Sequence, residues 1–116
     1  MDYFRTKRLL EPARNRSKGR PIANNTRIFD RGEYMAICLH TTDIIKFYPN
    51  GQVTLHSGGW ETVTTKDRIN RYTNARITQR NWVWTMGDGR LFFDGISVCP
   101  PVSEPANEAD LLWRHT

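Results

Sequence analysis

The sequence predicts an α+β fold made mainly of antiparallel strands, with about seven or eight short strands, one short central helix and a basic N-terminal arm. Two observations carry this prediction. Short apolar stretches are separated by turn residues at close intervals, which is typical of hairpins. One stretch in the middle of the chain has helical spacing instead. The predicted order is ββββ-α-βββ, and the pattern leaves open a small barrel or a sheet packed on one helix.

Residues 1–25 are predicted to form the basic, extended arm. Pro12, Gly19 and Pro21 interrupt regular structure, although residues 2–10 would allow a short helix. Residues 1–31 hold nine Lys and Arg against three acidic residues, whereas residues 32–116 hold eight against nine. The net charge of +5 therefore belongs to the arm. A basic arm favours nucleic acid, or an acidic protein surface, as its partner.

Residues 26–99 are predicted to form the folded body, since a chain of 116 residues fits one domain. The turns 30–33 and 49–51 are hairpin signals. Strands are expected at residues 26–29, 34–39, 43–48, 52–56, 76–79, 82–86, 90–93 and 96–98. The Pro-rich tail, residues 100–116, cannot continue a sheet, and a last helical turn is expected after Asn107.

The chain is organised around residues 54–73, where a strand turns on paired glycines and leads into the helix. Gly58 and Gly59 allow backbone angles that a Cβ would forbid, and Trp60 stands at the corner. Thr64 is the expected N-cap of a helix over residues 65–73. Ile69 and Tyr72 share one face of this helix and should dock it on the body.

The start of this helix is a candidate anion site. Its first amides lack intrahelical partners, and the Thr64 and Thr65 hydroxyls and Lys66 lie beside them. The plainer alternative is that Thr64 only caps the helix, Asp67 pairs with Arg71 at i,i+4, and Lys66 is solvated.

Three tryptophans of the body are candidates for base stacking or for the core. Trp82 and Trp84 are two residues apart, so a strand would place them on one face. At least one of them is expected in the core, whereas Trp60, at the glycine corner, is the better candidate for ligand contact.

His40 and His56 could transfer protons with Asp43 nearby. With Lys66 and Arg68 as anion stabilisers they would form a metal-free nuclease. The alternative, which we favour, is that both histidines have structural roles, either capping strand ends or bonding to the Gly58–Gly59 turn. The protein would then not be an enzyme.

No metal or cofactor is expected. Cys38 and Cys99 form no zinc motif, and Cys38 lies in an apolar run typical of a buried thiol. No apolar run of 18 residues spans a membrane, and no signal-peptide core begins the chain. A reduced, cytosolic protein is expected.

Several segments resemble a family of small uncharacterised proteins of tailed bacteriophages. The segments are residues 19–27, with the pattern GRPxxNNTR, residues 39–44, residues 57–60 and residues 64–70, where GGW is followed by TTKxRxN. The resemblance covers roughly residues 19–95 and implies action in the cytoplasm of the bacterial host, or in the virion. It supplies no activity and no catalytic residues.

The leading hypothesis is a phage protein that binds nucleic acid without catalysis. Its arm and its helix start would contact the phosphate backbone. The expected contact residues are Arg14, Arg16, Lys18, Arg20, Arg27, Trp60, Thr64, Thr65, Lys66, Arg68 and Arg71. The alternatives are a protein-binding inhibitor or accessory factor of a host or phage machine, a virion component, and the metal-free nuclease. DNA versus RNA and the oligomeric state stay open.

Overall fold

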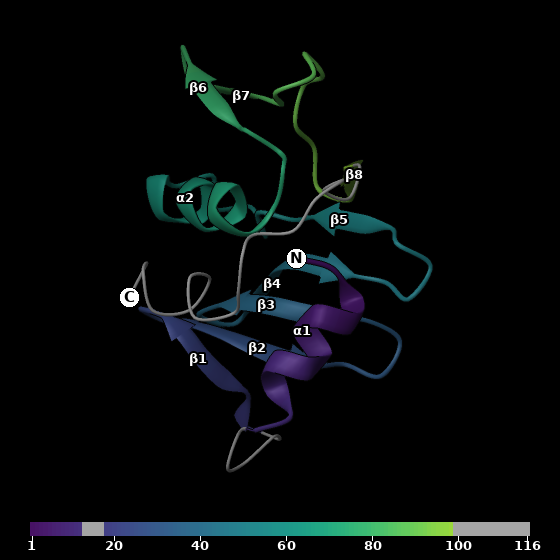
Figure 1. Cartoon of the computed structure of the whole chain (residues 1–116). Coiled ribbons are helices and arrows are strands. Elements are labelled where there is room, and N and C mark those ends of the chain that lie inside the picture. The colour runs from purple at the N-terminus through teal and green to yellow at the C-terminus, as the bar shows by residue number, and fades with distance from the viewer. Residues whose placement is uncertain (13–17, 99–116) are drawn as a thin grey trace.

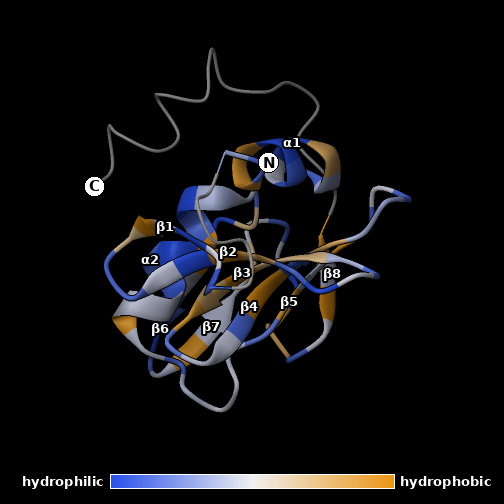
Figure 2. Ribbon diagram, turned by 90° about the horizontal axis from the view of Figure 1, so that it is seen from below, coloured by the Kyte–Doolittle hydropathy of each residue, from blue (hydrophilic) through white to orange (hydrophobic). Residues whose placement is uncertain are grey.

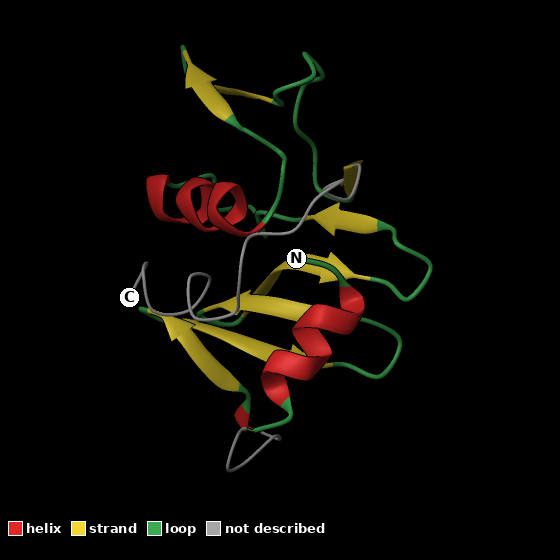
Figure 3. Cartoon of the chain, in the orientation of Figure 1, coloured by secondary structure: helices red, strands yellow, loops and turns green. Residues whose placement is uncertain are grey.

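The structure, a computed structural model, describes residues 1–12 and 18–98 and has the predicted α+β class with mostly antiparallel strands. Within these residues, two helices and eight strands follow one another along the chain (Figure 3). Their bounds are α1 Tyr3–Leu10, β1 Arg20–Ala23, β2 Thr26–Asp30, β3 Met35–Leu39, β4 Thr42–Phe47, β5 Val53–Leu55, α2 Val63–Tyr72, β6 Thr78–Arg80, β7 Val83–Thr85 and β8 Ile96–Val98.

The main sheet has six antiparallel strands in the order β1-β2-β3-β4-β5-β8 (Figure 1). Five consecutive strands each pair with the next, and β8 returns to pair with β5 after α2 and the β6–β7 hairpin. Of the two arrangements that the sequence left open, the structure has the open sheet, with β1 and β8 at its edges.

One face of this sheet, which we call the inner face, carries the core. The strand register places a row of buried side chains across it, namely Ile28, Ile37, Ile45, Leu55 and Ile96. Figure 2 shows the apolar stretches of the strands gathered in the middle of the molecule. Because the row is continuous from β2 to β8, one core joins the whole sheet.

Both helices pack on the inner face. Arg20, which pairs with Ile28, donates a hydrogen bond from Nη1 to the Leu9 carbonyl of α1 at 2.6 Å. Thr26, on the same face, accepts a bond from Arg68 Nε of α2 at 3.0 Å. The side chains that α2 buries include Ile69 and Tyr72, as their spacing predicted.

The N-terminal residues differ from the prediction of an extended arm over 1–25. Residues 3–10 form α1, and residues 20–23 form an edge strand of the sheet. Thr6, Leu9 and Leu10 lie one helical turn apart on a buried face, so α1 gains more from burial than an extended chain would. Asp2 caps α1 by accepting a bond from the Arg5 amide at 2.8 Å.

Helix α2 begins earlier than predicted. Its N-cap is Thr62, whose hydroxyl accepts a bond from the Thr65 amide at 3.1 Å, and not Thr64. Thr62 has extended backbone angles, as an N-cap requires, whereas Thr64 already lies inside the helix.

The segment after α2 differs from the sequence-based prediction in two ways. Asn81 and Trp82 both have left-handed backbone angles, with φ of 51° and 68°, so they form the β6–β7 turn. Trp82 is therefore 88% exposed while Trp84 is 2% exposed, and the two do not share a face. The predicted strand at 90–93 forms only one bridge, between Thr85 and Leu91.

The predicted C-terminal tail, residues 100–116, lies outside the described residues, as do Cys99, Arg14 and Arg16. Cys38 is the buried free thiol that the sequence predicted. Burial, with the nearby charge of Asp43, raises the pKa of that thiol. No described helix is long and apolar enough to cross a bilayer.

Candidate functional site

The four segments on which the sequence resemblance rests meet at one end of the sheet. The His40 amide, in the β3–β4 turn, donates to the Asn25 carbonyl in the β1–β2 turn at 2.8 Å. Arg68 ties α2 to the same turn through Thr26. Residues 57–60 complete the group, because they connect β5 to α2. These segments are separate in the sequence, and the fold brings them together.

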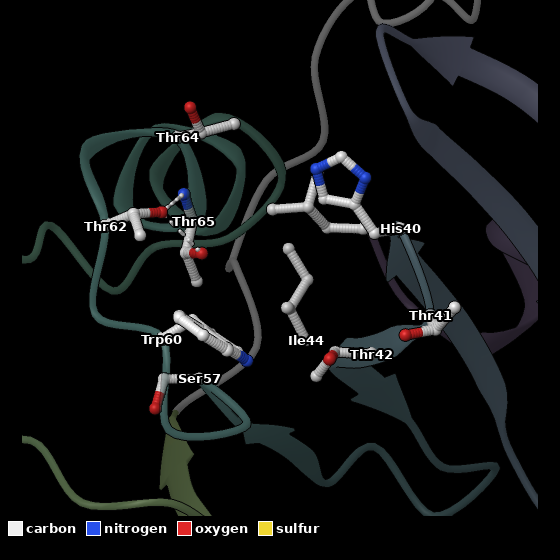
Figure 4. A pocket seen from close by; sticks show the side chains of 10 residues that line it. His40, Thr41, Thr42, Ile44, Ser57, Trp60, Thr62, Thr64 and Thr65 are labelled. Atoms are coloured by element: carbon white, nitrogen blue, oxygen red, sulfur yellow. Dashed lines mark hydrogen bonds between the residues drawn. The ribbon is translucent and has the colours of Figure 1, made fainter.

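A cavity of about 460 Å³ lies between these segments. Figure 4 shows α2 on one side of it and the β3–β4 turn on the other, with Ile44 between them. The lining residues are Leu39, His40, Thr41, Thr42, Ile44, Ser57, Trp60, Thr62, Thr64 and Thr65. The described lining thus combines apolar walls with several hydroxyl groups and one imidazole, and none of these described residues carries a carboxylate.

The glycine corner positions Trp60 as one wall of this cavity. The Ser57 amide and hydroxyl both donate to Asp94 Oδ1 at 2.8 Å, and the Trp60 amide donates to the Ser57 carbonyl at 3.0 Å. Burial acts to raise the pKa of Asp94, but the bonds from Ser57 outweigh burial and hold that pKa below its usual value. The corner leaves Trp60 70% exposed, a point that the sequence left open.

The start of α2 supplies donors at the same place. The cap takes up the Thr65 amide, so the amides of Val63 and Thr64 are the first-turn groups that an intrahelical bond does not reach. The Thr64 hydroxyl is exposed, whereas the buried Thr65 hydroxyl lies 3.0 Å from the Thr62 hydroxyl. Lys66, on the same turn, is half-buried and does not line the cavity.

Two predicted contact residues on α2 have structural partners. Arg71 pairs with Asp67 at 3.2 Å, which confirms the i,i+4 alternative. Arg68 also pairs with Asp67, and its side chain is only 12% exposed because it reaches Thr26 and the Asn24 carbonyl. Arg68 therefore joins α2 to the β1–β2 turn.

The histidines and Asp43 are not gathered into one set. His40 is exposed, lines the cavity and has a left-handed φ of 56°. His56 is half-buried, with Nε2 3.3 Å from the Thr54 hydroxyl, and burial followed by the charge of Lys46 lowers its pKa. Asp43 instead accepts two bonds from Arg31, at 2.9 and 3.1 Å. Of the residues in the nuclease alternative, only His40 lines the cavity.

The other described cations of the predicted set, Lys18, Arg20 and Arg27, do not line the cavity. Arg20 anchors α1, as described above. Lys18 and Arg27 are exposed, and Arg27 Nη1 donates to the Lys18 carbonyl at 3.2 Å. The described residues contain no group of three or more His, Cys, Asp or Glu side chains placed to hold a metal ion.

Sequence reasoning missed two surfaces. One is the face of the main sheet opposite the core, whose cations and aromatic rings could have been found from the strand alternation. The other is an exposed apolar set on the β6–β7 ribbon, formed by Trp82, Val83, Leu91 and Phe93. The alternation of a strand could not predict this second surface, because Trp82 lies in a turn and not in a strand.

Residues 7–98 match a protein-family model described as Kyanoviridae Gp96 protein. The match covers most of the chain and includes all four motif segments. No curated protein and no solved structure matches the sequence.

Proposed function

The chain belongs to the Kyanoviridae Gp96 protein family, a family of phage proteins. We propose that it binds single-stranded nucleic acid without catalysis inside the infected host. One observation carries the proposal, namely an exposed indole that walls a cavity of nucleotide-like size. Aromatic faces stack on unpaired bases of any sequence, and hydroxyl groups can both donate to and accept from base edges.

Phosphate binding beside the base is supported by the start of α2. The amides of Val63 and Thr64 and the positive end of the helix dipole favour an anion there. None of the described lining residues carries a carboxylate that would repel a phosphate. The net charge of +5 would assist encounter with any polyanion.

The test compares two exposed tryptophans. Fluorescein-labelled oligo-dT and oligo-U are titrated with the full chain, with Trp60→Ala and with Trp82→Ala. Trp60→Ala should weaken binding by about 1–3 kcal/mol, the value of one stacked base, with an unchanged melting temperature. Trp82→Ala is the control, because Trp82 is also exposed, at 88% against 70% for Trp60, but does not line the cavity. Equal loss in both variants, or no binding by the wild type, would refute the proposal.

The phosphate contact has its own test. Lys66→Ala should weaken binding of the same oligonucleotides without lowering stability, since a lysine at a helix surface contributes little to the fold. Arg76→Ala, which removes an exposed cation after α2, is the control. If the wild type cleaved the oligonucleotides without a metal ion and His40→Ala lost this cleavage, the protein would be a nuclease and not a non-catalytic binding protein.

Protein binding is the second candidate, and the exposed apolar set favours it. On the β6–β7 ribbon the buried side holds Trp84 and Phe92, whose rings are 5.1 Å apart, while Val83 and Phe93 are exposed. Exposed apolar patches on small domains often mark interfaces. Co-purification from infected cells with tagged wild type and Phe93→Ser would test it. Phe4→Ser is the control, since Phe4 is an exposed aromatic on α1. A partner that both variants retain would exclude this surface.

A further inference from the structure

The face of the main sheet opposite the core, which we call the outer face, is formed by the alternate residues of the strands. The register places Arg27 beside Cys38, Ala36 between Phe29 and Lys46, and Lys46 beside Thr54. Both helices and the buried side of the β6–β7 ribbon join the core on the inner face. Within the described residues, the outer face is therefore covered by its own side chains.

Those side chains hold cations in fixed positions. Arg31 lies over the Phe29 ring, 4.4 Å from its centroid, and reaches Asp43. Lys46 lies over the Tyr34 ring, 4.9 Å from its centroid. Ala36 and Cys38, beneath this layer, are buried although no helix covers them. Such cation–π contacts order long side chains that would otherwise lose entropy on binding a ligand.

The charge of the outer face is positive. Asp43 is the carboxylate on this face, and both of its oxygens accept from Arg31 while Tyr34 adds a third bond at 3.2 Å. Within the described residues, neither Arg27 nor Lys46 forms an ion pair with a carboxylate.

We propose that the outer face binds the phosphate backbone of a single-stranded nucleic acid that continues from the Trp60 cavity around the β3–β4 turn. The inference rests on the proposed function, and it adds the path of the strand. Arg27 pairs with Cys38, two residues before His40, so the cavity and the outer face adjoin at this turn. One cation already covers each of the Phe29 and Tyr34 rings, so we assign phosphate contacts to this face and base contacts to the Trp60 cavity.

The two available cations are placed for different phosphates. Arg27 and Lys46 stand two strands apart and two residues out of step, a Cα separation of about 12 Å from standard sheet spacings. Each should therefore contribute one independent phosphate contact. Contacts of this kind do not depend on base sequence and weaken with salt.

The experiment measures the salt dependence of binding for short and long oligonucleotides. Labelled dT4 and dT15 are titrated at several salt concentrations with the full chain, with Arg27→Gln/Lys46→Gln, and with the control Arg76→Gln/Arg80→Gln. For dT15, loss of two phosphate contacts should lower the slope of log affinity against log salt by about 1.4. For dT4, which the cavity can hold alone, the slope should hardly change. Melting curves confirm that each variant is folded.

The outcomes separate this inference from the proposed function. If dT15 binds and the Arg27/Lys46 variant keeps the wild-type slope, the outer face is not the backbone path while the cavity proposal stands. If the Arg76/Arg80 variant lowers the slope equally, the effect is one of total charge, and the outer face is again excluded. If neither oligonucleotide binds the wild type, the proposed function fails together with this inference.

Discussion

At the scale of single residues, Thr62 decides where α2 begins. Its hydroxyl accepts the Thr65 amide, and its extended backbone turns the chain into the helix. Thr62→Ala should lower the free energy of unfolding by about 1 kcal/mol, because it leaves that amide without its partner. Thr64→Ala should change it far less, since Thr64 is exposed inside the first turn. Urea unfolding of the two variants measures the difference. An equal loss of stability in both would show that Thr62 is not the N-cap.

Trp84 and Trp60 should differ in their contribution to stability, because one is buried and the other is exposed. Trp84 is 2% exposed and packs edge-on against Phe92 at 5.1 Å. Trp84→Ala should destabilise by about 3–5 kcal/mol through lost burial and a cavity. Trp60→Ala should leave the free energy of unfolding nearly unchanged, because that ring is mostly in solvent. Thermal melts on both variants test this, and unfolding of Trp60→Ala would make the corner part of the core.

Residue types alone predicted part of this picture. Ile69 and Tyr72 were assigned to the core from their helical spacing, because that spacing survives a shift of the helix start by two residues. The prediction of Thr64 as the N-cap was wrong. Several neighbouring threonines are equally suitable N-caps by residue type, and only the extended backbone at Thr62 identifies it as the N-cap. The partners of Arg68 could not be predicted, because Thr26 is far from it in sequence and close to it only in the fold.

At the scale of elements, the corner between β5 and α2 depends on Gly58. Its φ is +64°, and a Cβ would lie 2.8 Å from Thr42 Cγ2. Gly58→Ala should therefore destabilise the protein and disturb the cavity, because strain in the backbone adds to a clash. Gly59→Ala has the same backbone strain at φ +86° but meets nothing within 4 Å. The excess cost of Gly58→Ala over Gly59→Ala in urea unfolding measures the clash.

Thr42→Ser removes the methyl group that would collide and should recover part of that excess in the double variant. No recovery would mean that the Thr42 methyl group is not the source of the excess cost, because the Thr42 hydroxyl oxygen, 3.0 Å from the added Cβ, remains in the double variant.

The β4–β5 pair carries a pH dependence through His56. Burial and Lys46 lower its pKa in the folded protein, so the unfolded chain binds the proton more readily. The contribution of His56 to stability is therefore complete above its unfolded pKa of about 6.5. It is lost as the pH falls from there through the folded value. Urea unfolding between pH 8 and 5 should show this loss, and His56→Gln should remove that part of it. Lys46→Gln should raise the His56 pKa in an NMR titration, because it removes one of the two causes.

The strands were easier to predict than their partners. Ile45, Phe47, Val53 and Leu55 alternate with polar residues, and the β4–β5 hairpin follows from that pattern and from its turn. The pairing of β8 with β5 spans the whole of α2 and the ribbon, and short apolar stretches do not encode such a distant choice. The cavity has the same origin, since its walls come from three connections that only the sheet order brings together.

At the scale of the whole molecule, the N-terminal residues belong to the core, contrary to the basic arm that charge alone suggested. Composition shows many cations in residues 1–31 but does not show that Met1, Leu9 and Leu10 are buried beneath them. Among the described cations of this region, Arg5, Lys7 and Arg8 lie on α1, Arg20 lies on β1 and Arg27 lies on β2. Electrostatic contact of these five residues with nucleic acid would use a folded surface, which costs less conformational entropy on binding than an ordered tail would.

A final prediction follows from this placement. Leu9→Ala should lower the free energy of unfolding by about 2–5 kcal/mol, because the side chain is fully buried between α1 and the sheet. Phe4→Ala, on the exposed side of the same helix, should cost little and is the control. Deleting residues 1–12 should expose the inner face, abolish cooperative unfolding and create binding sites for a hydrophobic dye. A truncated chain that still melts cooperatively near the wild-type temperature would show that α1 is dispensable. Its cations would then be free to act as the arm that the sequence suggested.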